Sequence, residues 1–283
     1  MKLTHGIKRK LLQLAAFGFS NVHMTNFANG KIYEGKWKQF CNPGLNCYSC
    51  PAAALSCPIG ALQSVTGSMN FKFSFYVVGF LLAVGVLLGR VVCGWLCPFG
   101  LFQELIHKIP SPKFKLWHWV KYIKYVILAV FVILLPIVVT NFMGMGKPAF
   151  CQYICPAGTL EGGIPLLTTH EELRQTIGSL FFLKMAILIG TVIGCVLIYR
   201  FFCKALCPLG AIYGLLNKIS IYHLEIDQHK CVGCGKCASV CKMDVDPVKT
   251  PNSAECIRCG NCKTVCPVNA IHIGFRSGKE KNE

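Results

Sequence analysis

The last sixty residues of the chain contain two consecutive cysteine runs that share one spacing. They read Cys231-x2-Cys234-x2-Cys237-x3-Cys241 and Cys256-x2-Cys259-x2-Cys262-x3-Cys266, the latter followed by Pro267. Clustered thiolates at such short spacings are metal or cluster ligands. This spacing therefore constrains the C-terminal region more than any other feature of the chain.

The spacing is that of two-cluster bacterial ferredoxins, in which the fourth cysteine of each run ligates the other cluster. The predicted ligand sets are Cys231, Cys234, Cys237 and Cys266 for the first cluster, and Cys256, Cys259, Cys262 and Cys241 for the second. Residues 223–226 and 270–273 alternate like short strands that pair across the two ends of this region. Zinc knuckles also use Cys-x2-Cys, but two consecutive x2-x2-x3 runs are hard to reconcile with them.

The composition of the whole chain points away from an ordinary soluble protein. Only 14% of the 283 residues are charged, against roughly 25% in soluble domains. The 19 cysteines cannot all pair, and the chain is too long for a disulfide-stapled mini-protein. A net charge of +17 would favour nucleic acid only on a soluble fold with a basic face. We therefore expect a membrane protein whose cysteines hold metal, with no nucleic-acid partner.

Most of the positive charge flanks long uncharged stretches. Residues 222–283 have a net charge of only +2, whereas residues 1–221 have +15. Crossing the hydrocarbon layer takes about 20 apolar residues in a helix. Four stretches are candidates, the first of them weaker because it contains polar residues: Leu11 to Gly30, Phe73 to Gly89, Tyr125 to Gly146 and Gln175 to Tyr199.

The basic residues also predict an orientation. Lys and Arg gather before the first stretch, between the second and third, and after the fourth, and such an excess marks the cytoplasmic side. We expect a multi-pass protein of the cytoplasmic membrane with the N-terminus and residues 205–283 inside. Residues 31–70 and 147–175 would then face outward.

The predicted membrane region contains an internal repeat. Residues 90–100 match residues 200–210 at an offset of 110, and both copies contain Cys-x3-Cys-Pro. Each copy follows a stretch that runs inward, so the duplication is parallel and its axis lies along the membrane normal. The inner cysteines would meet at the cytoplasmic surface and suit one four-iron cluster: Cys93, Cys97, Cys203 and Cys207. Buried cysteine pairs or disulfides are the alternative.

A second pair of motifs lies on the predicted outer side. Cys57-Pro58 resembles Cys155-Pro156, and Cys151 completes a Cys-x3-Cys-Pro motif in the later copy, while Ala53 stands at that place in the earlier one. We predict an outer centre held by Cys50, Cys57, Cys151 and Cys155, with Cys41 and Cys47 as alternates. A disulfide within this group stays open, because the outside can be oxidising. Cys195 lies alone in the fourth stretch and is interpreted as a small apolar residue.

Three side chains near the inner motif are candidates for handling the protons of a quinone. They are His107, His118 and Glu104, and ordinary interfacial helix residues would look the same. No nucleophile motif, phosphate loop or catalytic acid–base pair is present, so no catalytic residue is predicted.

The paired Cys-x3-Cys-Pro motifs, flanked by apolar stretches and followed by the eight-cysteine region, resemble the NapH-type membrane ferredoxins, which are related to the membrane cores of the NosR and CcoG types. The resemblance covers roughly residues 70–283. It implies membrane-bound electron transfer between the quinol pool and a partner redox protein. It also implies cluster ligation by the four inner cysteines and the eight C-terminal ones, whereas the outer group departs from the core pattern.

The sequence thus predicts an α-helical membrane domain over residues 1–221, with about four spans and a parallel repeat. An α+β two-cluster ferredoxin domain would follow over residues 222–283. The expected cofactors are two [4Fe–4S] clusters in the latter, one at the inner motifs and a further centre outside. We expect an electron-transfer subunit of an oxidoreductase complex with separate donor and acceptor subunits. The alternatives are a quinol dehydrogenase subunit with its own quinone site and a redox metal-handling or maturation factor.

Overall fold

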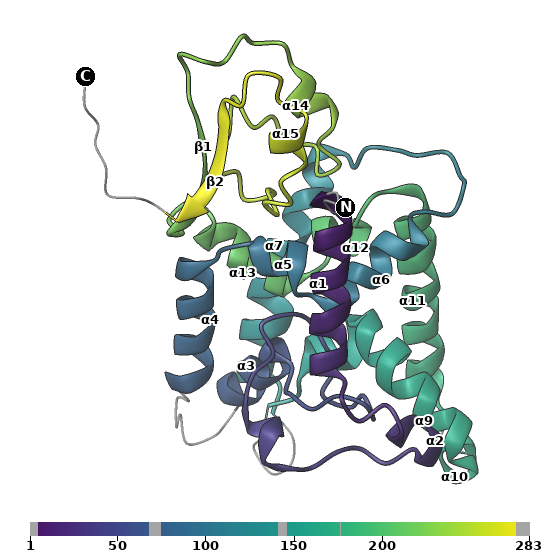
Figure 1. The fold of residues 1–283 in the computed structure, drawn as a ribbon. Helices are drawn as coiled ribbons and strands as arrows, with labels where there is room; N and C mark the ends of the chain where they lie inside the picture. The colour runs from purple at the N-terminus through teal and green to yellow at the C-terminus, as the bar shows by residue number, and fades with distance from the viewer. Residues whose placement is uncertain (1–4, 68–74, 141–145, 176, 276–283) are drawn as a thin grey trace.

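A computed structural model describes residues 5–67, 75–140, 146–175 and 177–275. Figure 1 shows a bundle of helices with the two strands at one end and the helices α2, α9 and α10 at the other. The N-terminal helix α1 (His5–Ser20) runs along the middle of the bundle. The cysteine motifs therefore lie at different levels along one long axis.

The C-terminal region contains the paired strands that the sequence predicts. Strand β1 (Tyr222–Ile226) pairs antiparallel with β2 (Ile271–Phe275), and Ile226 lies opposite Ile271. Two short helices, α14 (Lys236–Ser239) and α15 (Asn261–Thr264), lie between the strands in the chain. Each is preceded by a glycine with a φ of +70° or +81°, a conformation that favours glycine. The prediction that both ends of this region pair is confirmed.

Two helices in the described ranges are long and apolar enough to cross a membrane. One is α11 (Ser179–Leu197). The other is continuous from His118 to Val138 and comprises η2 (His118–Tyr122), α7 (Ile123–Ile127), η3 (Leu128–Leu134) and α8 (Leu135–Val138). Helix α4 (Phe75–Leu87) is apolar but shorter, and residues 68–74 before it lie outside the described ranges.

Two predicted stretches have different bounds in the structure. The helix expected through Gly30 ends at Ser20, because the Asn21 side chain bonds back to the Phe17 carbonyl and the chain then turns into the short helix α2 (Asn26–Asn29). The third predicted stretch is a helix that begins at His118 rather than at Tyr125. Lys124 is tolerated inside that helix because it forms an ion pair with Glu255.

The internal repeat is confirmed at the level of secondary structure. Helices α5 (Val91–Trp95) and α6 (Pro98–Ile106) match α12 (Phe201–Ala205) and α13 (Pro208–Leu216) at the offset of 110. Pro98 and Pro208 each occupy the first turn of a helix, where the missing N–H has no intrahelical partner to lose.

The end of the bundle opposite the strands is made of short elements. It contains η1 (Lys36–Gln39), α3 (Pro58–Thr66), η4 (Phe150–Ile154), η5 (Gly158–Gly163), α9 (Ile164–Thr169) and α10 (Glu171–Gln175). Helix α3 and the η5–α9 helix each follow one of the outer Cys-Pro pairs.

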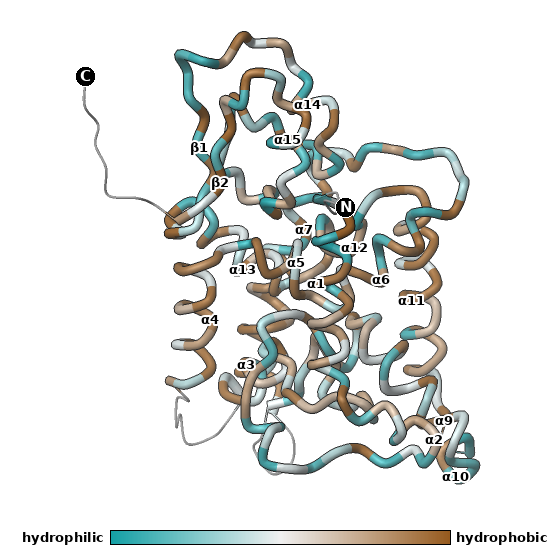
Figure 2. The backbone as a smooth tube through the Cα atoms, viewed as in Figure 1, coloured by the Kyte–Doolittle hydropathy of each residue, from teal (hydrophilic) through white to brown (hydrophobic). Residues whose placement is uncertain are grey.

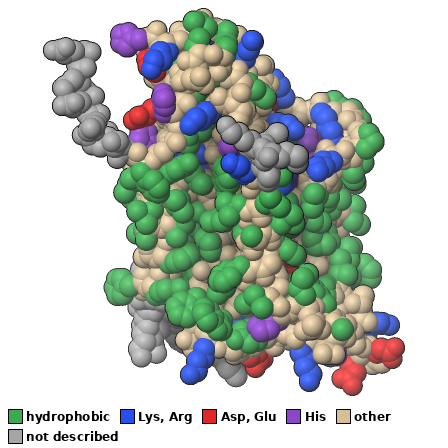
Figure 3. Space-filling view, viewed as in Figure 1, with side chains coloured by type: hydrophobic (Ala, Val, Ile, Leu, Met, Phe, Trp, Pro, Cys, Tyr) green, Lys and Arg blue, Asp and Glu red, His purple; other side chains and the backbone are tan. Residues whose placement is uncertain are grey.

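The surface has an apolar middle between two charged ends. Figure 2 shows hydrophobic residues along α4 and α11, and Figure 3 shows apolar side chains over the middle of this face with Lys, Arg, Asp and Glu toward its ends. Phe182 and Leu183 on α11 are 68% and 50% exposed. Soluble monomers rarely expose apolar patches of such extent, so this surface suits a membrane environment.

Candidate metal centres

The first of four cysteine groups lines a cavity of about 190 Å³ in the C-terminal region. Its cysteines are Cys231, Cys234, Cys237 and Cys266. Cys234 is exposed and Cys237 is buried, so the cavity reaches the solvent. The structure thus brings together the first predicted ligand set, whose role as ligands stays a prediction.

The second group lines a smaller cavity of about 20 Å³. Its cysteines are Cys241, Cys256, Cys259 and Cys262. None of the four is exposed, and the buried side chains of Met243 and Ile257 also line the cavity. Each run therefore places its fourth cysteine at the cavity of the other run, as the two-cluster spacing predicts.

The third group is formed by the repeated inner motifs, and all its cysteines are buried: Cys93, Cys97, Cys203 and Cys207. Cys97 and Cys207 have nearly the same backbone angles, with φ of −74° and −75° and ψ of 117° and 112°. The charges of the thiolates would be close enough to repel one another. The two halves of the repeat thus converge on one site.

Two buried arginines tie the halves of this inner site together. Arg90 precedes the first motif and donates to the carbonyl of Cys203, at 2.7 Å. Arg200 holds the same place in the second motif and donates to the carbonyl of Cys93. This reciprocal exchange is what a twofold relation between the repeats requires, and it places two positive charges beside the cysteines.

Each arginine has a carboxylate partner from a different part of the chain. Glu104 on α6 accepts from Arg200 at 2.5 Å and from Arg9 at 2.8 Å, and it also pairs with Lys10. Burial alone would raise the pKa of Glu104, but these cations outweigh it and lower the pKa to about 2. Glu104 is therefore an anion at neutral pH, which argues against its predicted role as a quinone proton carrier.

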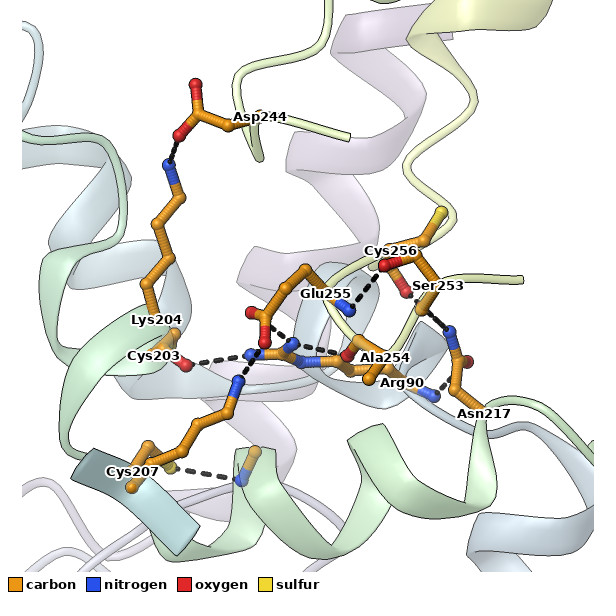
Figure 4. Close-up of polar contacts among 12 residues, drawn as sticks. Arg90, Cys203, Lys204, Cys207, Asn217, Asp244, Ser253, Ala254, Glu255 and Cys256 are labelled. Atoms are coloured by element: carbon orange, nitrogen blue, oxygen red, sulfur yellow. Dashed lines mark hydrogen bonds and ion pairs between the residues drawn. The ribbon is translucent and has the colours of Figure 1, made fainter. Parts of the chain in front are cut away.

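The partner of Arg90 comes from the C-terminal region. Arg90 donates to Glu255 at 2.7 Å and to the Ala254 carbonyl at 2.5 Å (Figure 4). Lys124 also pairs with Glu255. Glu255 adjoins Cys256, a residue of the second cavity. One guanidinium therefore joins the inner site to that cavity.

Further contacts fix how the C-terminal region sits on the helices. Asn217 donates to the carbonyls of Ser253 and Cys256 at 2.7 and 3.1 Å, and Lys204 pairs with Asp244 at 2.6 Å (Figure 4). Gly94 takes the place of Lys204 in the other repeat, and a Cβ there would lie 2.5 Å from the Ile257 carbonyl. Both repeats thus contact the second cysteine run, and Lys204 of the second repeat also contacts the segment after the first run.

The fourth group lines a pocket of about 150 Å³ between the loop around Leu45, the start of α3, the turn between η4 and η5, and Lys184 of α11. Its cysteines are Cys47, Cys57, Cys151 and Cys155. The prediction had assigned Cys50 to this group and Cys47 as an alternate. In the structure Cys47 lines the pocket, whereas Cys50 is buried with Ala52 and Ala53 in a cluster on which Cys47 also packs. Cys41 is buried in the main core and is not among the lining residues of the pocket.

Two glutamines donate to cysteine sulfurs and escaped the sequence analysis. Gln103 donates to Cys203 Sγ at 3.0 Å, and Gln63 donates to Cys151 Sγ at 3.1 Å. Both side chains are fully buried. The signal was present, since each glutamine stands six residues after a Cys-Pro cysteine in the pattern Cys-Pro-x-Gly-x-x-Gln.

The four groups suit iron–sulfur clusters better than single ions. In the described residues no three His, Cys, Asp or Glu side chains converge closely enough to hold one metal ion. A zinc ion needs four ligands at about 2.0–2.3 Å, whereas a four-iron cluster takes each of its four thiolates at a separate iron atom. All 19 cysteines are free in the structure, and 16 of them belong to these groups. Four cysteines per site match the four ligands of a [4Fe–4S] cluster.

Comparison with protein families agrees with this chemistry. A family model described as a 4Fe-4S binding domain matches residues 73–116, 126–164 and 180–222. Two further models with the same description match residues 223–245 and 250–272. This chain is a ferredoxin-type 4Fe-4S protein. The chain thus contains several 4Fe-4S binding domains, and its resemblance to the NapH type agrees with its relatives.

Three relatives illustrate the likeness of this iron–sulfur protein to known chains. The uncharacterized protein MJ0749 of Methanocaldococcus jannaschii is 27% identical over 56% of this chain and 53% of its own length. The methylamine utilization ferredoxin-type protein MauN of Methylobacillus flagellatus is 27% identical over 66% of this chain and 61% of its own. Protein NirI of Paracoccus denitrificans is 28% identical over 61% of this chain and 24% of its own. The chain thus spans between a quarter and about three fifths of these relatives, and no solved structure matches it.

The three quinone candidates do not share one place. His118 lines a cavity of about 640 Å³ with Tyr122, Tyr125 and Glu255. His107 is not among the lining residues of that cavity, and its Nδ1 lies 3.1 Å from the Cys195 carbonyl. His118 therefore lies beside a cavity, whereas Tyr199 contacts both His107 and Glu104 elsewhere in the fold.

Proposed function

We propose that this protein is a membrane-bound electron-transfer subunit that relays electrons between its C-terminal ferredoxin domain and an outer cysteine centre by way of the inner site. In this proposal residues 222–283 hold two [4Fe–4S] clusters. Residues 1–221 form the membrane domain, and its repeat holds a third cluster. Each cluster supplies one-electron redox chemistry, while the chain provides the ligands, the spacing and the charges.

The contact of Arg90 with both sites carries the proposal. One guanidinium donates to the carbonyl of the inner ligand Cys203 and to Ala254 and Glu255 beside Cys256. Trp95, in the inner motif, also donates to the Arg258 carbonyl at 3.1 Å. A fixed short contact between two redox sites is what electron transfer between them needs.

Burial supports an order of the sites. The cavity that contains Cys234 has an exposed cysteine, whereas none of the cysteines of the second cavity is exposed and Cys256 contacts Asn217 of the membrane domain. The first cavity is therefore the place where a soluble redox partner could approach. The second would pass electrons on to or from the inner site, and the outer pocket would be the far end of the relay.

The placement in the membrane follows from the apolar helices and the basic residues. The helix His118–Val138 and α11 would cross the bilayer, with α1 and the α4 segment as the remaining two of four spans. The Lys and Arg excess puts the N-terminus and the ferredoxin domain on the cytoplasmic side. The active unit is then a complex in which separate subunits donate and accept the electrons.

A quinone site is the second candidate, favoured by the cavity beside His118. That cavity is lined by Tyr122, Tyr125 and Glu255, and Glu255 also contacts Arg90. A quinone there would adjoin both the inner site and the second ferredoxin cavity. Replacing His118 with alanine would then slow reduction of the clusters by a quinol but not by dithionite.

Sealed inside-out vesicles test the relay directly. Dithionite outside would reduce the ferredoxin domain, and ferricyanide trapped inside would accept the electrons. We expect rapid ferricyanide loss with the wild type and with Cys195→Ala, and loss at the protein-free rate with Cys93→Ala. Protein-free rates for the wild type in vesicles whose clusters are intact would overturn the proposal.

A further inference from the structure

We infer that the outer pocket is a fourth four-thiolate iron–sulfur site, held by Cys47, Cys57, Cys151 and Cys155 and tuned by Gln63. This inference deepens the proposed function, since it defines the far end of the relay. It also assigns the fourth ligand to a loop residue outside any Cys-x3-Cys motif.

The outer pocket repeats the backbone of the inner site. Four of the cysteines that precede a proline, two from each site, share one conformation, with φ between −75° and −66° and ψ between 111° and 124°: Cys57, Cys97, Cys155 and Cys207. A glycine follows three residues later in every case. At Gly60 and Gly158 a Cβ would meet Cys151 Sγ and Cys47 Sγ at 3.9 and 3.8 Å, so these glycines border the thiols.

Cys47 fills the place that the motif leaves vacant. The first copy has Ala53 where Cys-x3-Cys requires a cysteine. Cys47 lies on the pocket, and its backbone N–H donates to Glu161 Oε2 at 2.7 Å. Glu161 stands six residues after Cys155, where Tyr213 stands after Cys207, and the Tyr213 hydroxyl likewise donates to the same loop, at the Pro43 carbonyl. Both sites thus fix this loop by equivalent positions.

The same loop joins the outer pocket to the inner site. A Cβ at Gly44 would lie 2.7 Å from Cys97 Cα, and the Leu45 backbone N–H faces the Cys97 thiol. Leu45 also lines the outer pocket. Because three residues span at most about 11 Å, the chain from Gly44 to Cys47 keeps the two sites adjacent.

In both sites a buried glutamine donates a hydrogen bond to a cysteine sulfur. Gln63 Nε2 donates to Cys151 Sγ while its Oε1 accepts from the Phe150 N–H at 2.9 Å, and this double contact fixes its orientation. At the inner site Gln103 Nε2 donates to Cys203 Sγ at 3.0 Å, and Gln103 Oε1 accepts from the Cys203 backbone N–H at 3.4 Å. A donor at a ligand sulfur stabilises the reduced cluster, because the sulfur becomes more negative on reduction.

Paired alanine variants test the ligand set on anaerobically purified protein. Four clusters correspond to about 16 iron atoms per chain. We expect Cys47→Ala to retain about 12 iron atoms per chain, with a matching loss of acid-labile sulfide. The matched variant Cys50→Ala should retain about 16 iron atoms. The iron that remains in Cys47→Ala also reports that the rest of the chain has folded. Equal content in both variants, or loss in Cys50→Ala only, would overturn the assignment.

Potentiometric EPR on Gln63→Leu and Gln103→Leu tests the site without removing a ligand. We expect each variant to lower the midpoint potential of one cluster, a different one in each, at unchanged iron content. Unchanged potentials in Gln63→Leu would overturn the role of Gln63. These readouts do not depend on vesicle transfer, so an outer cluster without transmembrane transfer would reject the relay and keep the site.

Discussion

The inner and outer cysteine sites share one backbone but differ in charge. The inner site has Arg90 and Arg200 bonded to the carbonyls of its own cysteines, whereas the outer pocket has Lys184 at its lining and Glu161 behind Cys47, and burial raises the pKa of Glu161 to about 7. Positive charge beside a cluster favours its reduced form, so two arginines favour reduction more than one lysine does. Duplication thus preserved the ligand geometry while the neighbouring charges diverged, and we expect the outer centre to have the lower potential.

The largest expected effect is on which clusters become reduced when a cysteine of the inner or of the outer site is replaced. Cys93→Ala removes an inner ligand, so electrons from the ferredoxin domain should reach neither membrane site. Cys57→Ala removes an outer ligand and should leave reduction of the inner cluster intact. Freeze-quench EPR after mixing with dithionite would follow each cluster. Loss of inner reduction in Cys57→Ala would show that the outer site precedes the inner one.

Replacing Glu104 with leucine should lower the free energy of unfolding by destabilising the region around the inner site. Arg200 and Arg9 would be left buried without their anion, and breaking a buried pair costs roughly 3–5 kcal/mol. Thermal unfolding of Glu104→Leu in detergent would measure this loss. Glu171→Leu is the matched control, since Glu171 is exposed and should change stability by less than about 0.5 kcal/mol. Similar unfolding temperatures for the two variants would contradict the role of Glu104.

Glu255→Ala should weaken the contact between the ferredoxin domain and the inner site. Arg90 and Lys124 would lose a shared anion at this junction. We expect transfer from the ferredoxin clusters to the inner cluster to slow by about tenfold, equivalent to about 1.4 kcal/mol of docking free energy. Glu255→Asp should restore part of the rate. An unchanged rate in Glu255→Ala would mean that Asn217 and Lys204 suffice for docking.

The smallest effect concerns Glu161 in the outer pocket. Glu161→Ala would leave the half-buried Cys47 N–H without this acceptor, at a cost of up to about 1–3 kcal/mol, and should lower iron occupancy of the outer site. Glu161→Gln retains an acceptor oxygen and should restore the occupancy. Equal iron content in all three proteins would show that Glu161 does not position Cys47.

The features that could be predicted from the sequence are those that depend on the spacing of residues along the chain. The Cys-x2-Cys runs, the paired strands and the offset of 110 all depend on short-range pattern, and the structure reproduces the latter two directly. Cys47 could not be chosen over Cys50 because both lie in a loop whose path depends on tertiary contacts. The ion pairs of Glu104 could not be predicted because its partners Arg9, Lys10 and Arg200 lie more than 90 residues away in the chain.

The pairing of Arg90 with Glu255 has a consequence for biogenesis. Arg90 is made in the first repeat, and its carboxylate is synthesised 165 residues later. Arg200, in contrast, finds Glu104 already in the chain. During synthesis Arg90 therefore lacks its carboxylate partner until the C-terminal region has folded onto the helices. We expect the inner site to reach its final charge balance only when the last segment of the polypeptide is in place.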